Sequence, residues 1–129
     1  MKIKRNKTFS GTPWESRFGY ARAVQVGDVV HVSGTTGTDP SGKVLAPSDM
    51  YAQTAQAIRN IESALQRLGL GLEQVVRTRI YVTQIDRWEE VAKAHAEFFG
   101  QIHPATSLIG VARLIDPEML VEIEAEAVA

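Results

Sequence analysis

The hydrophobic periodicity changes from that of a helix to that of a strand between residues 49 and 83. Over residues 49–68 one mainly apolar stripe recurs at alternating steps of four and three residues, the spacing of a single helix face; its members are Thr54, Ile58, Ile61, Leu65 and Leu68. Residues 75–83 alternate instead, with Val76, Thr78, Ile80 and Val82 on one strand face and Arg77, Arg79, Tyr81 and Thr83 on the other. This succession restricts the chain to folds in which helices pack on a sheet.

Turn residues mark two further strands upstream of that helix. Residues 18–24 and 29–34 are predicted to be strands joined by a tight turn at Gly27-Asp28. Residues 39–42 then have the side chains of a type I turn, with Pro at the second position and Gly at the fourth.

Downstream of residue 83 we expect one helix and two strands. Asp86 and Glu89 have the spacing of a capping box, which predicts the start of a second helix that ends at Gly100. Strands are expected near 105–113 and 119–127. The inner face of the second helix is expected to include Val91, Ala94 and Phe98.

The resulting order is ββ-α-β-α-ββ, which predicts an α+β fold with a mixed sheet and two helices on one face. With 129 residues, we expect one domain over residues 1–129. Five strands covered by only two helices leave one sheet face bare, and we expect an oligomer to bury it.

Composition excludes several classes of function. Lys and Arg number 14 against 15 Asp and Glu, a net charge of −1, which disfavours a protein that grips nucleic acid by its phosphates. The absence of cysteine excludes disulfides, thiolate catalysis and Cys-ligated zinc. Unbroken apolar runs reach only three residues, so we expect no membrane span and a cytoplasmic protein.

Two apparent motifs are better explained as ordinary structure. Residues 37–43 match the start of a phosphate-binding loop, but Val44 occupies the position where such a loop needs Ser or Thr for magnesium, and Pro40 removes a backbone donor. The three histidines, His31, His95 and His103, have no metal-ligand spacing. We therefore expect no metal and no cofactor.

The last strand carries three carboxylates on one face, because Glu122, Glu124 and Glu126 alternate with apolar residues. For Glu124 and Glu126 a solvated face is the favoured interpretation. Glu122 has two possible roles that the sequence leaves open: a solvated side chain, or a partly buried general base that positions a water.

A second candidate cluster combines aromatic and basic residues: Trp14, Phe18 and Tyr20 lie close in sequence to Arg17 and Arg22. Plain aromatic packing with surface cations explains this stretch. The functional alternative is a small-molecule pocket with aromatic walls and a cationic or hydroxyl handle. Base stacking on a nucleic acid is the weaker choice, because the stretch is short and the chain is slightly acidic.

Several strings together resemble the RidA/YjgF family, the reactive-intermediate deaminases also labelled L-PSP endoribonucleases. The resemblance runs from about Phe18 to the C-terminus and implies a chorismate mutase-like fold, a homotrimer with a barrel-like core, and ligand pockets in the clefts between subunits. The strings that carry it are Gly19-Tyr20, Val32-Ser33-Gly34, residues 75–82, Pro104-Ala105-Thr106-Ser107 and residues 121–125.

In deaminating members of that family an Arg after Pro-Ala binds the substrate carboxylate, a final-strand carboxylate positions water, and a Tyr lines the pocket. The resemblance places Glu122 and Tyr20 in the catalytic roles, whereas Thr106 replaces the Arg and Leu108 stands where many members have Cys. A guanidinium binds a carboxylate through two parallel hydrogen bonds. Loss of such a contact to the substrate typically lowers kcat/KM by roughly two to three decades. The other expected ligand-binding residues are Ser33, Gly34, Trp14, Arg17, Arg22 and Arg79.

Three functions remain open on this basis. The leading hypothesis is a trimeric enzyme that hydrolyses an imine or enamine lacking the usual carboxylate. The second is a metabolite-binding or holdase-like module of the same fold that has lost the chemistry. The third is a ribonuclease, which the charge balance disfavours.

Overall fold

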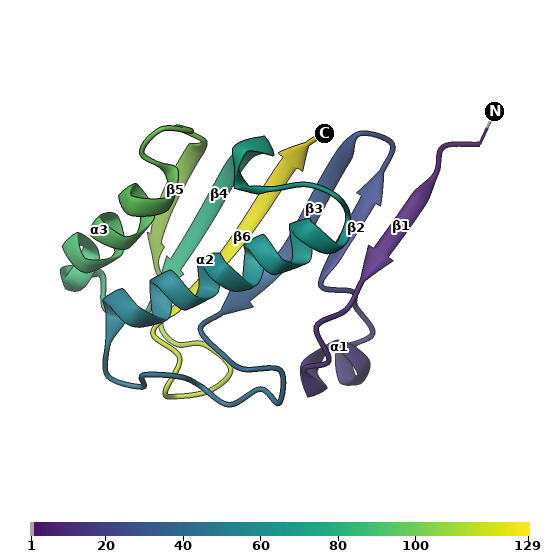
Figure 1. Cartoon of the computed structure of the whole chain (residues 1–129). Helices are drawn as coiled ribbons and strands as arrows, with labels where there is room; N and C mark the ends of the chain where they lie inside the picture. The colour runs from purple at the N-terminus through teal and green to yellow at the C-terminus, as the bar shows by residue number, and fades with distance from the viewer. Residues whose placement is uncertain (1) are drawn as a thin grey trace.

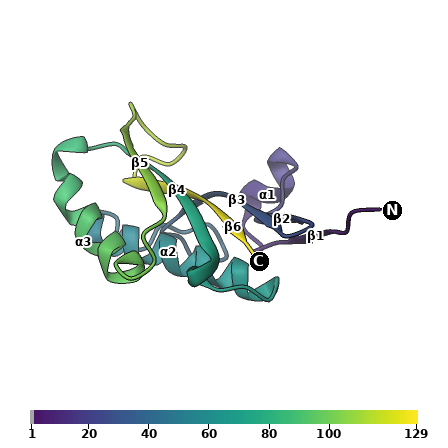
Figure 2. The same ribbon diagram turned by 90° about the horizontal axis from the view of Figure 1, so that it is seen from above.

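The computed structural model describes residues 2–129, which form one six-stranded sheet with two long helices on one face (Figure 1). The strand order is β1-β2-β3-β6-β4-β5, and all neighbours are antiparallel except the parallel pair β4 and β5. Figure 2 shows α2 and α3 on the same side of the sheet. The α+β class with a mixed sheet is confirmed.

The elements are β1 (Arg5–Thr8), α1 (Pro13–Phe18), β2 (Ala23–Val26), β3 (Val29–Thr36), α2 (Met50–Arg67), η1 (Leu72–Gln74), β4 (Val75–Val82), η2 (Ile85–Arg87), α3 (Trp88–Phe99), β5 (Ala105–Gly110) and β6 (Val121–Val128).

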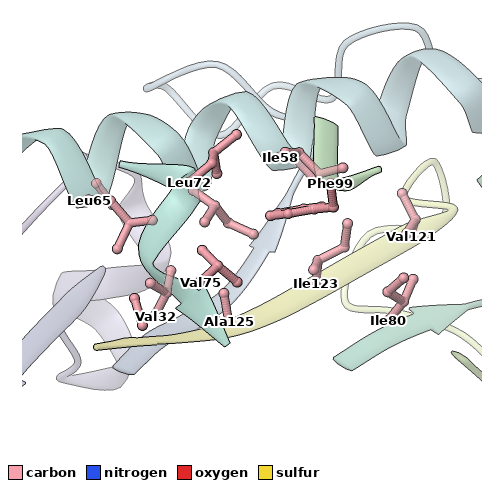
Figure 3. Packing of buried hydrophobic residues seen from close by; sticks show 14 of the residues in the cluster. Val32, Ile58, Leu65, Leu72, Val75, Ile80, Phe99, Val121, Ile123 and Ala125 are labelled. Carbon is pink, nitrogen blue, oxygen red and sulfur yellow. The ribbon is translucent and has the colours of Figure 1, made fainter. Parts of the chain in front are cut away.

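The core lies between α2, α3 and the sheet face that they cover (Figure 3). The side chain of Asp49 caps α2 by accepting a hydrogen bond from the Ala52 N–H, at 2.9 Å. The predicted stripe of α2 faces the sheet, and Ile58, Ile61 and Leu65 are each fully buried. The inward face of β6 supplies Val121, Ile123 and Ala125 to the same core.

The N-terminal region differs from the prediction of a strand over residues 18–24. Residues 13–18 form the short helix α1, because Pro13 begins it and Gly19 ends it in the left-handed conformation at φ 80°. Strand β2 therefore starts only at Ala23. A strand that was not predicted, β1, pairs with β2 and makes the sheet six-stranded rather than five-stranded.

Two details around β4 and α3 also differ from the sequence prediction. A register shift between Val75 and Arg77 places Val75 in the core and leaves Val76 48% exposed, so Val76 is not on the apolar face. The turn η2 occupies the expected capping position, and α3 starts without a side-chain cap. Its inner face includes Phe99, which is 2% exposed, and the predicted Phe98 packs against the core only partly buried.

The predicted turns are confirmed. Gly27-Asp28 joins β2 to β3, and the Gly42 N–H donates to the Asp39 carbonyl at 2.9 Å. Residues 37–43 are thus a turn, and no helix starts there. Over residues 2–129, the structure contains no helix that is long and apolar enough to cross a membrane.

Candidate functional site

A cavity of about 540 Å³ brings together six of the nine predicted site residues. Its walls come from α1, β3, the middle and end of α2, and the start of β6. The predicted residues that line it are Trp14, Tyr20, Arg22, Ser33, Gly34 and Glu122.

Glu122 reaches the cavity across a gap in the side chains of β3. The pairing of β3 with β6 shifts register between Val32 and Thr35, which places Gly34 beside the Glu122 carboxyl. A Cβ at position 34 would lie only 2.5 Å from Oε2 of Glu122. The close approach of this carboxyl to the backbone therefore requires glycine at position 34.

Burial raises the pKa of the Glu122 carboxyl above its ordinary value, the charge of Glu124 raises it further, and Arg22 opposes the shift. Within residues 2–129 no hydrogen bond stabilises this carboxylate. The other two acids of the strand are paired: Glu124 accepts from the Tyr81 hydroxyl at 2.5 Å and Glu126 from Arg79 at 2.7 Å. Glu122 is thus the carboxylate with free acceptor oxygens, and the other two are half-buried and bonded instead of simply solvated.

Arg22 is only 6% exposed and spans the wall of the cavity. Its guanidinium donates to Glu15 at 3.2 Å, to the Gly34 carbonyl at 2.6 Å and to the Thr35 hydroxyl at 2.9 Å. It also donates to the Tyr20 hydroxyl at 3.1 Å and lies 5.4 Å from the centre of that ring. Arg22 therefore fixes Tyr20 and the Gly34 segment, and few of its N–H groups remain for a ligand.

Glu15 was not predicted as part of the site, yet it holds Arg22 in place. The carboxyl is 4% exposed and accepts hydrogen bonds from the Ser10 N–H and hydroxyl, from Thr12 and from Arg22. Burial raises the pKa of Glu15, but these hydrogen bonds together outweigh it and hold the pKa below its ordinary value. The available signal was that Glu15 is the only acid among residues 1–27.

Trp14 lines the cavity, and its indole Nε1 is buried with no acceptor among residues 2–129. Ser33 is turned partly toward the backbone, since its hydroxyl donates to the Ala21 carbonyl at 2.7 Å. Both residues border the space beside Tyr20 and Gly34, so this end of the cavity offers aromatic walls and polar groups.

Three predicted residues lie outside this cavity. Arg17 is exposed on α1, and Arg79 is paired with Glu126 across β4 and β6. Thr106 lies on the edge strand β5 opposite Thr78, whereas Glu122 lies opposite Tyr81. Positions 78 and 81 point to opposite faces of the sheet, so within one chain the sheet separates Thr106 from Glu122.

No cluster of three or more His, Cys, Asp or Glu side chains within residues 2–129 has a geometry suited to a metal ion. The Nδ1 atom of His31 lies 3.7 Å from Glu126, and His103 occupies a loop at φ 57°. His95 is on α3 and contacts Thr78 through Nε2 at 3.0 Å.

Comparison with known proteins gives consistent matches along nearly the whole chain. The family described as Endoribonuclease L-PSP matches residues 12–129. An uncharacterised protein of Streptomyces coelicolor is 42% identical over 119 residues, 92% of this chain and 87% of that protein. The mouse protein named 2-iminobutanoate/2-iminopropanoate deaminase is 32% identical over 123 residues, 95% of this chain and 90% of that protein. A crystal structure of a YjgF-family member from Mycobacterium tuberculosis has a TM-score of 0.89 and 49% identity, and the match covers 98% of this chain and 100% of that one.

Proposed function

The chain belongs to the L-PSP endoribonuclease family, also called RidA/YjgF, and on that premise we propose that it hydrolyses imines or enamines. The mouse relative is named for the deamination of two 2-imino acids, which is chemistry of this kind. We place the complete site between copies of the chain in a homotrimer, with no metal and no cofactor.

The observation that carries this proposal is the state of Glu122. Its carboxylate is half-buried, lies in a cavity and accepts no hydrogen bond within residues 2–129. The raised pKa of Glu122 lies nearer to neutral pH than that of an ordinary glutamate. The ionised carboxylate is therefore a better proton acceptor. These properties are those of a general base that activates a water.

In the proposed reaction Glu122 takes one proton from water as the oxygen attacks the carbon of the C=N bond. The C=N π electrons move to nitrogen, and a carbinolamine forms. Protonated Glu122 returns its proton to that nitrogen, which completes the neutral carbinolamine. The Glu122 carboxylate then carries the O–H proton of the carbinolamine to the nitrogen, the C–N bond breaks, and ammonia leaves as the C=O bond forms. The balance is one imine and one water giving one carbonyl compound and one ammonia.

Tyr20, held by Arg22, borders the space where the reacting carbon would lie. Its hydroxyl accepts the Arg22 N–H and keeps its own proton for the ligand. Thr106 lies across the sheet from Glu122 in the same chain, so its contribution to this site would come from a neighbouring copy. The sheet face opposite α2 and α3, which no long helix covers, and the exposed edge strand β5 support such an assembly.

The second candidate function is ligand binding without chemistry, and the replacement of the expected arginine by Thr106 favours it. Ribonuclease activity has less support. The cavity places Asp39, Glu122 and Glu124 against two arginines, and Arg22 is already committed to internal hydrogen bonds. Such a surface does not attract the phosphates of RNA.

The proposal is tested by measuring ammonia release from freshly generated imines with the purified protein. The panel contains matched imines with a carboxylate and without one. Release above the spontaneous rate is the expected result. Saturable binding of the corresponding ketones without any release would favour the binding module, and cleavage of RNA by a homogeneous preparation would favour the ribonuclease.

A further inference from the structure

A chain of hydrogen bonds connects α3 to the exposed edge strand β5 on the helix-covered face of the sheet. The Nε2 atom of His95 lies 3.0 Å from the Thr78 hydroxyl, which lies 2.8 Å from the Thr106 hydroxyl. The Thr106 hydroxyl donates to the carbonyl of Pro104 at 3.2 Å. Thr78 is fully buried and Thr106 is exposed, so the chain runs from the interior to the surface.

One arrangement of the protons satisfies all three contacts of this hydrogen-bond chain. Each threonine hydroxyl has one proton to donate and two lone pairs to accept. The Thr106 proton is used by Pro104, so the short contact between the hydroxyls requires Thr78 to donate to Thr106. The Thr78 proton is then used, so in this arrangement His95 donates from Nε2.

His95 is suited to that role. His95 is half-buried beside Phe99, with the ring centres 4.6 Å apart, and burial lowers the pKa of His95 below its ordinary value. A neutral imidazole with its proton on Nε2 donates to Thr78 and leaves no buried charge. All three contacts are then satisfied at once.

The hydrogen-bond chain ends at the surface in the Thr106 hydroxyl, whose oxygen has one free lone pair and no free proton. Thr106 accepts from Thr78 and donates to Pro104, so what it offers to a ligand is an acceptor. An arginine at this position would offer only donors, which suit a carboxylate. We propose that Thr106 accepts a hydrogen bond from the substrate, and that the substrate is an imine or enamine whose remote end is an amide N–H or hydroxyl donor.

This inference rests on the proposed function only for the reacting C=N group, because the selectivity of Thr106 concerns the other end of the molecule. Stable ketones therefore test it without turnover. Pyruvamide and pyruvate differ only in carrying an amide or a carboxylate at that end. We expect the wild-type assembly to bind pyruvamide more tightly in calorimetric titrations.

Thr106→Val removes the acceptor and keeps the shape of the side chain. We expect it to weaken pyruvamide binding by roughly 3- to 10-fold, the value of one neutral hydrogen bond, and to leave pyruvate binding unchanged. Thr106→Ser restores the hydroxyl and should restore the preference. Ser107→Ala is the matched control, since this hydroxyl lies on the same strand but bonds Arg77 on the other face.

His95 acts through Thr78, so it is a positioning residue. His95→Phe should reduce the preference for pyruvamide, and His95→Gln, whose amide can donate at a similar place, should restore it. Tighter binding of pyruvate, binding of neither ketone, or an unchanged preference in Thr106→Val would overturn the inference. Absence of ammonia release from every imine, with the amide preference intact, would instead refute the proposed function alone.

Discussion

Glu122 and Glu124 lie two residues apart on one strand face, yet only Glu122 is free of hydrogen bonds within residues 2–129. Glu124 is engaged by Tyr81 and raises the pKa of Glu122 by its charge. Catalysis needs the ionised form of Glu122. The acid limb of the kcat/KM profile should therefore have its midpoint at a pH above 4.5, the ordinary pKa of a glutamate.

Glu124→Gln removes the negative charge next to Glu122. The pKa of Glu122 should then be lower, and the acid limb of the kcat/KM profile should move to lower pH. The profile is measured with a neutral imine, so that substrate ionisation does not contribute. An acid limb that stays in place would show that another group controls it.

Glu15 gives a prediction about stability. Its pKa is lowered in the folded state, so its contribution is present at neutral pH and is lost as the pH falls below 4.5 and through the folded-state pKa. Glu15→Gln leaves the Arg22 charge buried without its partner, and should lower the free energy of unfolding by about 3 kcal/mol at pH 7. Denaturant titrations at a fixed protein concentration measure this loss, which should shrink at acid pH. Equal losses at pH 7 and pH 4 would contradict the assignment.

At the scale of elements, the irregularity in β3 positions the candidate base. Gly34→Ala should push the Glu122 carboxyl aside, because the new Cβ would lie 2.5 Å from Oε2. The flexible glutamate can move, so the unfolding free energy should change little while kcat/KM falls about 10²-fold. Adding Glu122→Asp, with its shorter side chain, should recover part of the rate. Full activity in Gly34→Ala would show that the carboxyl does not need this position.

Local pattern was sufficient for the elements whose signals are strong. The α2 stripe and the alternation of β6 were both predicted and are both present. The start of the chain was predicted less well, because α1 has only six residues and its signals, Pro13 and Gly19, compete with an apparent alternation. The shift near Val76 depends on the pairing of β4 with β6, which periodicity within one strand does not contain.

The candidate site was predictable only in part, and mainly through resemblance to a known family. Glu122 and Tyr20 come from strings that resemble a known family, and the cavity places them together. The engagement of Arg22 by Glu15, and of Thr106 by Thr78, depends on contacts between segments distant in sequence or on neighbouring strands. The periodicity of a single sequence does not predict such contacts.

At the scale of the whole molecule, one sheet face lacks the long helices α2 and α3 (Figure 2), and Ile109 of the edge strand lies on it with 41% of its surface exposed. If copies of the chain cover this face, Ile109→Glu should dissociate the assembly and abolish imine hydrolysis together. Light scattering coupled to gel filtration measures the mass. Leu45→Glu, in the loop before α2, is the control and should leave both properties unchanged. A monomeric wild-type protein with full activity would contradict the shared site.

The most direct test of the account is a comparison of wild type with Glu122→Gln in ammonia release from one imine at saturating concentration. We expect the rate to fall by about 10²- to 10⁴-fold, because Gln cannot accept the proton of water. The assembly should stay intact and its thermal stability should be equal or higher, since the raised pKa of Glu122 means that folding disfavours the charge that Gln removes. Glu126→Gln, on the same strand face, controls for the loss of one charge. Retention of wild-type turnover in Glu122→Gln would contradict the assignment of Glu122 as the base.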